Sequence, residues 1–412
     1  MMHAAVGVWI LSAVICVGRG HHHIGHEADQ DTTVDTGVNS RSMVTQANKE
    51  FAYRLYLKLA AHADSEGKNI FFSPISVSVA LSALSVGARE ETHRQLFSGL
   101  GFNNSLLTQS DVDQAFQMLF ERANNASQED SSEGTAVFVD RRFRPRPEFL
   151  ETLKQSYAAD GFIVDFFQVK DSADTINKYV EEKTNGKIDK LVDSLDPTTV
   201  MYLISYIYYK GKWANPFDPK LTKEDFFTVD ENTKVPVQMM NMEDRFDTYY
   251  DQAINTSVLH LPFNNSYSML LLLPDDMATL ENAICPGHLT KWLKWMKSRT
   301  YDVYIPKFSI KASYKLNDVL TEMGMTDMFG DRANFSGISE GQQLAVSDVV
   351  HQATLDVDEA GATAAAVTGV GITLLSFRYI PVLKFNHPFM VIITERNTES
   401  ILFMGKIINP NI

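Results

Sequence analysis

Apolar residues in the first part of this chain recur at helical spacing. Phe51, Leu55 and Leu59 lie four residues apart and predict an amphipathic helix. A second helix is predicted to begin at Pro74, because Ser73 can cap it and proline fits the first helical position. The residues that follow are apolar on most faces, so we expect this second helix to be deeply buried.

Further helices and several strands are predicted along the rest of the chain. Residues 200–209 (VMYLISYIYY) are apolar on both alternating faces, which predicts a strand covered on both sides. Residues 389–396 and 401–410 predict a closing hairpin. Strands are also predicted at 234–242 and within 257–274, and helices through Ile176, Tyr179 and Val180, ending near Gly186, and through Leu320, Met323 and Met325.

These elements follow one another without an internal repeat or a linker. The chain has 412 residues, and 44% of them are hydrophobic, which is enough for a large core. Length alone would allow two or three domains. Since no boundary is visible within residues 46–412, we predict one large mixed α/β domain there.

The N-terminus predicts a secretory signal peptide at residues 1–20. Residues 4–17 form an apolar run that ends in small residues, and cleavage after Gly18 or Gly20 fits this pattern. A buried N-terminal helix is the alternative. No later run is long and apolar enough to span a membrane, and the last four residues carry no signal for retention in the endoplasmic reticulum. We therefore expect a secreted, extracellular, plasma-like protein.

Residues 21–45 are polar and acidic and predict a disordered tail. Four histidines lie in it, at His21, His22, His23 and His26. They could bind a transition metal, but nothing nearby supplies a fixed geometry, so a solvated tail is the favoured interpretation. The role of this cluster stays open.

Charge, cysteine content and glycosylation motifs narrow the class of protein further. The net charge of −14 argues against nucleic acids and anionic membranes as partners, since both require a basic surface. Of two cysteines, Cys16 lies in the signal peptide and Cys285 remains, so stability should rest on the core rather than on an internal disulfide. Five Asn-x-Ser/Thr motifs predict a secreted glycoprotein: Asn103, Asn125, Asn255, Asn264 and Asn334.

Several motifs typical of metal and cofactor sites are absent from the sequence. It contains no HExxH or CxxC motif and no glycine-rich phosphate loop. The isolated histidines outside the tail lack metal-ligand spacing. We therefore predict that the protein is not an enzyme and that it uses no cofactor or metal.

Small and apolar residues dominate a stretch near the C-terminus, residues 358–376 (DEAGATAAAVTGVGITLLS). Which structure such a stretch adopts is the main question for function. From Ala362 to Ser376 it has no charge, proline or ring, and it is too short to cross a bilayer. Its alanines and glycines disfavour a strand, while its valines, threonines and glycines weaken a helix. The stretch is therefore compatible with two states.

The sequence resembles the serpin family of protease inhibitors from about Phe51 to Pro410, in particular its secreted antitrypsin- and antichymotrypsin-type members. The resemblance rests on seven segments: residues 69–88, 203–217, 235–242, 303–329, 333–339, 346–366 and 382–410. It implies the serpin fold, with three β-sheets, eight or nine helices and an exposed reactive loop at about residues 359–381. It also implies that a target protease cleaves this loop and is trapped as an acyl-enzyme while the loop inserts into the large sheet.

The composition of residues 358–376 fits that mechanism. As an inserted strand it would turn alternate side chains into the core, where an unpaired charge would cost several kcal/mol. The even positions Ala362 to Ile372 carry no charge. Family members with Thr or Ser at position 362 are common, but alanine is small enough to insert. We call residues 359–368 the hinge, and the resemblance assigns it Glu359, Gly361, Ala362, Ala364, Ala366 and Thr368.

The family's spacing from the hinge glutamate places the cleaved bond at Leu375–Ser376. Leucine fits the apolar pocket of chymotrypsin-like proteases, and elastase or cathepsin G are further candidates. The distance from Leu375 to Phe385 matches neither the antitrypsin nor the antichymotrypsin pattern. Phe377, with similar specificity, and Arg378, suited to trypsin-like enzymes, therefore remain open.

The resemblance also implies two groups of supporting residues. Ser73, Ser76, Ser205 and His351 match the family's polar cluster beneath the sheet, which we call the sheet-opening cluster. Ser205 stands where the family usually has asparagine; because serine is shorter, its hydrogen bonds could run through water or be lost, and His351 could compensate. Glu359 is expected to pair with Lys307 at the top of the sheet, near Trp213. The alternative interpretation of Ser73 is a simple helix cap, and that of Glu359 is a solvated charge without a partner role.

We therefore expect a secreted, monomeric suicide inhibitor of serine proteases. The alternative is a non-inhibitory serpin that carries a hormone or another small ligand; a collagen-type chaperone is disfavoured because the retention signal is missing. The region that binds heparin in several serpins corresponds here to the acidic residues 110–130, so no strong heparin binding is expected.

Overall fold

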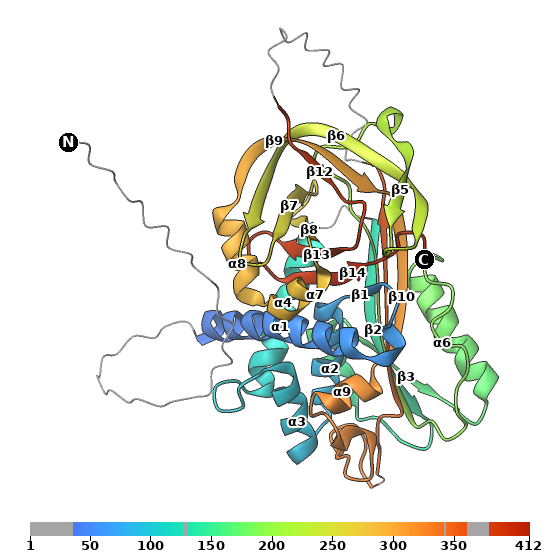
Figure 1. Cartoon of the computed structure of the whole chain (residues 1–412). Coiled ribbons are helices and arrows are strands. Elements are labelled where there is room, and N and C mark those ends of the chain that lie inside the picture. Colours follow the sequence, from blue (N-terminus) through green and yellow to red (C-terminus); the bar gives the residue numbers. More distant parts are fainter. Residues whose placement is uncertain (1–35, 127–129, 342, 361–378) are drawn as a thin grey trace, which may run out of the picture.

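The computed structural model describes residues 36–126, 130–341, 343–360 and 379–412. Within these ranges the chain forms nine α-helices and fourteen strands (Figure 1). The helices are α1 (Thr36–Ala61), α2 (Pro74–Ser85), α3 (Glu90–Leu100), α4 (Gln109–Ala126), α5 (Pro147–Tyr157), α6 (Val169–Lys183), α7 (Met277–Ala283), α8 (Pro286–Trp295) and α9 (Asn317–Glu322). The mixed α/β class and the expected number of helices are confirmed.

Five strands form one sheet in the order β10-β11-β4-β2-β3. They are β2 (Asp130–Asp140), β3 (Asp160–Val164), β4 (Met201–Lys210), β10 (Phe308–Lys315) and β11 (Asp348–Val357). Figure 1 shows this sheet nearly edge-on, with α6 on one side and β1 and the N-terminal helices on the other. Strand β4 is buried along nearly its whole length, as its two apolar faces predict.

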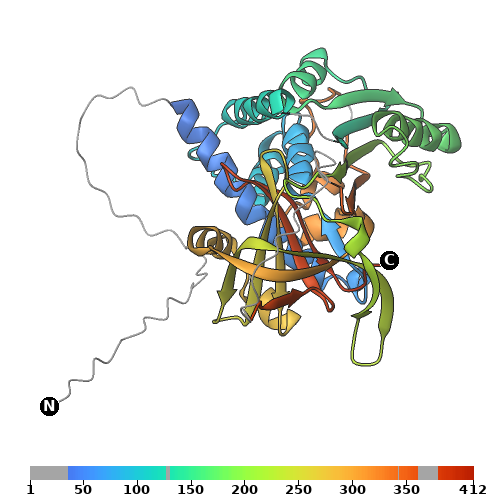
Figure 2. The ribbon, with the colours of Figure 1, turned by 90° about the horizontal axis from the view of Figure 1, so that it is seen from above.

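The remaining nine strands are hydrogen-bonded into a second sheet. They are β1 (Ile70–Phe72), β5 (Lys223–Thr228), β6 (Lys234–Asp251), β7 (Thr256–Pro262), β8 (Tyr267–Pro274), β9 (Lys297–Pro306), β12 (Val382–Lys384), β13 (Phe389–Glu395) and β14 (Ile401–Ile407). Figure 2 shows α6 and the strands of this second sheet at opposite ends of the molecule. The predicted closing hairpin is β13–β14, which pair antiparallel.

The expected three sheets appear as two hydrogen-bonded networks because β6 is 18 residues long. Its first part pairs with β5, its middle with β9 and its last residues with β7. One continuous strand therefore joins two layers that would otherwise be separate sheets.

Two boundaries differ from the sequence-based expectation. Helix α1 begins at Thr36, so the tail predicted as disordered up to residue 45 is helical in its last part. The polar residues there lie on a helix that packs through Val44 and later apolar residues against the core. Helix α9 ends at Glu322, because Gly324 has a positive φ of 93°, so Met323 and Met325 lie beyond it.

Three groups of buried apolar side chains stabilise the fold. The largest lies among α1, α2 and their neighbours, the second lies between the two sheets, and the third lies under α6. In the described part of the chain, no helix combines the length and the apolar composition that crossing a membrane requires. The expectation that stability rests on the core rather than on an internal disulfide stays a prediction.

Candidate functional site

Hydrogen bonds connect the residues after strand β11 to the segment that follows β4. The backbone N–H of Trp213 donates to Ala360 O at 3.0 Å, and its indole Nε1 donates to Asp358 O at 2.7 Å. Phe217 N donates to Glu359 O at 3.2 Å. The residues that lead into the reactive loop are thus held by three hydrogen bonds from one short segment.

Charged side chains at the top of the sheet add two ion pairs to these hydrogen bonds. Lys307 Nζ lies 2.8 Å from Glu359 Oε2, the contact that the resemblance implies, and Thr222 Oγ1 donates to Glu359 Oε1 at 2.7 Å. Burial acts to raise the pKa of Glu359, but Lys307 and Thr222 together outweigh it and the pKa is lowered. Lys210 Nζ pairs with Asp358 Oδ2 at 2.7 Å.

The four residues of the sheet-opening cluster lie together beneath the five-stranded sheet, and all are buried. Ser73 caps α2: its Oγ accepts from Ser76 N at 3.3 Å and donates to Ser76 Oγ at 2.9 Å. Ser73 N donates to His351 Nε2 at 2.9 Å, and His351 Nδ1 lies 3.0 Å from Ser205 Oγ. The cap role and the cluster role of Ser73 therefore coexist.

The hydrogen bonds of His351 determine its protonation. Because Nε2 accepts from a backbone N–H, the ring proton sits on Nδ1 and is donated to Ser205 Oγ. Complete burial lowers the pKa of His351 to about 3, so the ring is neutral at pH 7. The serine at position 205 makes this contact directly, with no need for the longer asparagine.

His351 and Ser205 face each other across the pair of strands β4 and β11. These strands run parallel, and their register joins Asp348 to Tyr202 through Leu355 to Tyr209, with His351 opposite Ser205. The sheet is therefore closed between β4 and β11 in this structure. The cluster connects both strands to α2 at the place where they would have to separate.

Strand β11 also carries two buried polar groups that lack partners. Gln352 Nε2 and Thr354 Oγ1 have no hydrogen-bond partner within the described part of the chain. A buried unsatisfied group costs roughly 1–3 kcal/mol.

The remaining reactive-loop residues named from the sequence lie outside the described residues. They are Gly361, Ala362, Ala364, Ala366, Thr368, Leu375 and Ser376, with the alternatives Phe377 and Arg378. The described chain resumes at Tyr379 and enters β12, which pairs parallel with β9. Both ends of the loop are thus fixed to the body of the protein.

Sequence reasoning missed part of this site. Thr222, Phe217 and the Lys210–Asp358 pair were not expected. Nothing in the local pattern marks them, because each lies far in sequence from its partner. The acidic run Asp358-Glu359 just before a charge-free stretch was the available signal for the two ion pairs.

The glycosylation motifs differ in their surroundings. Asn255 and Asn264 are exposed, and Asn103 is half-buried in a turn. Asn334 is also half-buried, and its Nδ2 already donates to Glu90 Oε2 at 3.2 Å, which disfavours modification there. Asn125 lies on α4, where its side chain is outside the described residues.

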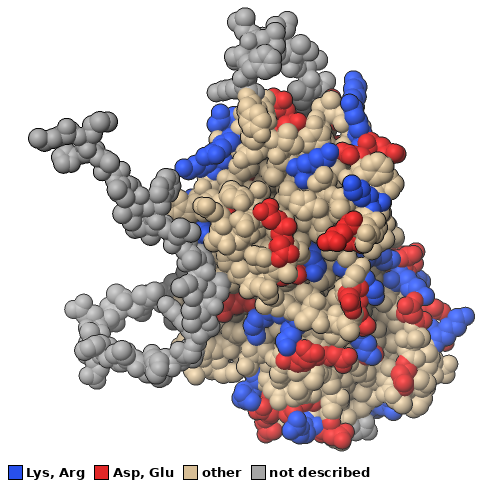
Figure 3. Space-filling view, viewed as in Figure 1, with Lys and Arg blue, Asp and Glu red and all other residues tan. Residues whose placement is uncertain are grey.

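Charge on the face in Figure 3 and metal ligands among the described residues would be the signals of a second site. Acidic and basic side chains are interspersed over the face shown in Figure 3. Within the described ranges, no three His, Cys, Asp or Glu side chains come close enough to hold a metal ion. The four histidines at positions 21–26 lie outside those ranges, so their role stays open.

The fold and this site together define a class of protein in which a closed sheet stands next to a long loop anchored at both ends. A family model described as "Serpin (serine protease inhibitor)" matches residues 46–410. The chain therefore belongs to the serpin family, whose members of this type inhibit serine proteases and are not themselves catalysts.

Relatives and solved structures agree with this assignment. The chain is 37% identical to an alpha-1-antitrypsin-like protein of Tamias sibiricus, over 98% of both chains, and 38% identical to Serpin A3-5 of Bos taurus, over 91% of this chain and 90% of that one. Human thyroxine-binding globulin in complex with thyroxine has a TM-score of 0.84 at 35% identity, covering 90% of this chain and all of that chain. Human glycosylated kallistatin has a TM-score of 0.83 at 35% identity, covering 90% of this chain and 99% of that one.

Proposed function

We propose that this serpin is a secreted suicide inhibitor of chymotrypsin-like or elastase-like serine proteases. The protease attacks Leu375, forms an acyl-enzyme and is trapped when residues from the hinge onward insert between β4 and β11. The observation that carries the proposal is the closed, parallel β4–β11 pair directly beside the anchored start of the loop.

Strand geometry favours such an insertion. A segment that turns back after β11 runs antiparallel to β11 and also to β4, since these two are parallel. Insertion therefore replaces one parallel pairing with two antiparallel pairings, which are more stable per residue. It also brings new backbone and side-chain groups next to β11, where Gln352 Nε2 and Thr354 Oγ1 have no partner among the described residues.

The composition of the hinge permits this movement. Residues 361–366 are Gly-Ala-Thr-Ala-Ala-Ala, so the first inserted positions demand little space and no burial of charge. The clamp to be broken consists of the two hydrogen bonds of His351 and the strand pairing above it. Such hydrogen bonds contribute about 1 kcal/mol each, which an inserted strand readily offsets.

The first test is to mix the purified protein with chymotrypsin and to resolve the products on a denaturing gel. An SDS-stable band near the summed mass, together with a released peptide that begins at Ser376, is the expected result. A peptide that begins at Arg378 or Tyr379 would move the bond to Phe377 or Arg378. Cleavage without any complex, by chymotrypsin, elastase, cathepsin G and trypsin alike, would overturn the proposed inhibition.

A pair of matched variants tests the insertion step. Ala364 and Ala365 are neighbours, so they face opposite sides of an inserted strand. We expect Ala364→Arg to turn the inhibitor into a substrate, because its charge would enter the core, and Ala365→Arg to keep most of the inhibition. Equal loss in both variants would contradict insertion in this register.

A second function, carriage of a small ligand, is favoured by one observation. Thyroxine-binding globulin, which binds thyroxine, is among the structures similar to this chain. A carrier would tolerate Ala364→Arg without loss of function. Tight binding of thyroxine by the purified protein, with no protease complex, would favour the carrier over the inhibitor.

A further inference from the structure

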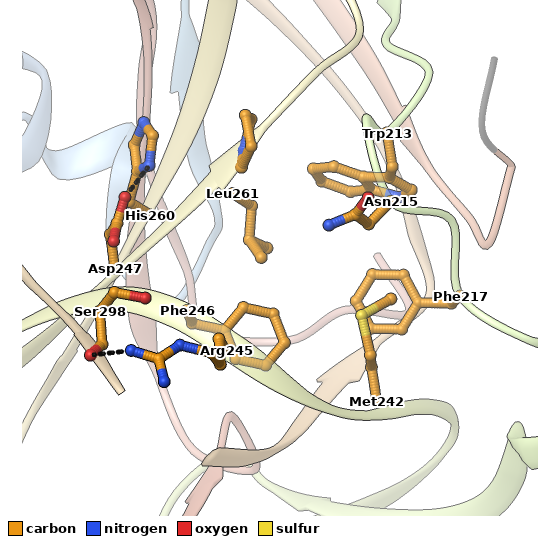
Figure 4. Close-up of a pocket in the computed structure, with 11 residues that line it drawn as sticks. Trp213, Asn215, Phe217, Met242, Arg245, Phe246, Asp247, His260, Leu261 and Ser298 are labelled. Carbon is orange, nitrogen blue, oxygen red and sulfur yellow. Dashed lines mark hydrogen bonds and ion pairs between the residues drawn. The ribbon is translucent and has the colours of Figure 1, made fainter. Parts of the chain in front are cut away.

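A pocket lies directly behind the residues that hold the start of the reactive loop, and we call it the Trp213 pocket. Its apolar side is formed by Trp213, Phe217 and Met242, and its polar side by Arg245, Asp247 and His260, with Leu261 between them (Figure 4). These residues come from β6, β7 and the segment after β4. No pattern in the sequence indicates this site.

The apolar side of the pocket is rigid. Trp213 and Phe217 are each only 3% exposed. The indole of Trp213 stacks on Phe263 with ring centroids 4.6 Å apart, and Phe217 meets its edge at 6.0 Å. A flat ring is therefore the shape that these walls favour as an occupant.

The polar side offers one cation to an anionic group, the exposed guanidinium of Arg245, and it also holds the exposed carboxylate of Asp247 beside His260, whose pKa burial lowers. Among the described residues, no carboxylate lies within ion-pairing distance of Arg245, which donates from Nη2 to Ser298 O at 3.3 Å. Asp247 instead turns its carboxylate toward His260 Nδ1, 3.9 Å away. Arg245 thus keeps most of its five N–H donors for a ligand, and a carboxylate accepts two of them at once.

The size of the pocket limits the ligand. Its volume is about 210 Å³. Sites for drug-sized molecules occupy roughly 300–1,000 Å³, so a single ring with a short acidic chain is the class that fits. We propose that the Trp213 pocket binds a small aromatic carboxylate and that an occupant slows insertion of the reactive loop.

The second half of this proposal follows from the double role of two residues. Trp213 and Phe217 line the pocket, and the same residues donate hydrogen bonds to the carbonyls of Asp358, Glu359 and Ala360. Insertion requires a reversal of the chain after Val357, which moves those carbonyls. A ligand packed against Trp213 and Phe217 stabilises the arrangement that insertion must break. This half rests on the proposed inhibitory function, whereas the binding claim rests on the pocket alone.

Binding is tested on the intact full-length secreted protein by calorimetric titration with 3-phenylpropanoate, and with its neutral amide as the comparison. We expect the acid to bind with a Kd of about 1 mM or lower and the amide to bind about tenfold more weakly, since the amide loses the ion pair with Arg245. Arg245→Gln should weaken binding of the acid by about tenfold. Arg299→Gln, which removes a nearby exposed charge outside the pocket lining, is the matched control and should leave binding unchanged.

A second variant tests whether the ligand binds in the pocket itself, independently of any indirect effect of Arg245→Gln on the structure. Met242→Trp should fill the pocket from its partly buried edge and abolish binding, with circular dichroism and melting temperature reporting that the fold is kept. Equal affinity for acid and amide, no binding at about 10 mM, or unchanged binding in both variants would overturn the site.

Coupling is tested by the fraction of molecules that form the SDS-stable complex with chymotrypsin. Saturating 3-phenylpropanoate should lower that fraction about two- to fivefold in the wild type and leave it unchanged in Arg245→Gln. The variant serves as the control for any effect of the ligand on the protease itself. No change in the wild type despite measured binding would overturn the coupling. No complex even without ligand would instead count against the proposed function, while the calorimetric result would still decide the binding site.

Discussion

The neutral state of His351 predicts that acid weakens this protein through the sheet-opening cluster. His351 is fully buried, its Nε2 accepts from Ser73 N, and its Nδ1–H faces Ser205. A second ring proton would place an N–H against the N–H of Ser73 and remove that hydrogen bond. The perturbation is therefore a fall in pH from 7 to 5, compared between the wild type and His351→Gln.

The expected magnitude follows from the shift of the His351 pKa from 6.5 to about 3. Because the folded pKa is lowered, the unfolded chain binds more protons between these values, and stability falls as pH falls from about 6.5 toward 3. Between pH 7 and pH 5 the unfolded histidine goes from about one-quarter protonated to almost fully protonated, while the folded one stays neutral. The free energy of unfolding should decrease by about 2 kcal/mol more in the wild type than in His351→Gln.

Two measurements check this prediction. NMR of the histidine rings, with His351→Gln assigning the signal among 11 histidines, should show no titration of His351 above about pH 4. Urea unfolding at both pH values gives the difference between the two proteins. Because each protein serves as its own reference, the contributions of the other titrating groups cancel. A midpoint for His351 above pH 5, or equal losses of stability in the two proteins, would refute the reasoning.

Three further predictions concern the loop and its anchors. Lys307→Met should lower the free energy of unfolding by about 1 kcal/mol at pH 7, a modest value because Lys307 is 38% exposed. This loss should become smaller in acid, because protonation of Glu359 removes the ion pair in the wild type as well. Urea unfolding of both proteins at pH 7 and pH 3 measures the difference. Ala364→Arg should yield cleaved protein and no SDS-stable complex. Leu375→Arg should move complex formation from chymotrypsin to trypsin; unchanged inhibition of chymotrypsin with no gain against trypsin would contradict the Leu375–Ser376 assignment.

Local signals in the sequence were sufficient for many elements. The cap at Ser73 and the proline after it determine the start of α2, and the two apolar faces of residues 200–209 anticipate the buried strand β4. These features depend on near neighbours in the chain, which is why they are readable. The tail boundary failed because polar residues at Thr36–Thr45 join a helix that is stabilised by packing further along, at Phe51 and beyond.

The candidate site was only partly accessible in the same way. The resemblance named Ser73, Ser205 and His351, but it left open whether a serine at position 205 could reach the histidine. The register of β4 against β11 decides that, since it places the two side chains opposite each other at 3.0 Å. The hydrogen bonds from Trp213 and Phe217 to residues 358–360 also join segments that lie about 140 residues apart in the chain.

The sequence by itself predicted a secretory leader, and its resemblance indicated the family and a hinge that has no charge after Glu359. Those properties are local, because they depend on composition and on alternation along a single strand. Only the tertiary structure decided that β4 and β11 are closed, which tautomer His351 carries, and that a pocket lined by Trp213 and Arg245 lies behind residues 358–360. Each of these is a relation between distant segments, and a distance across the fold is fixed by packing and register rather than by neighbouring residues.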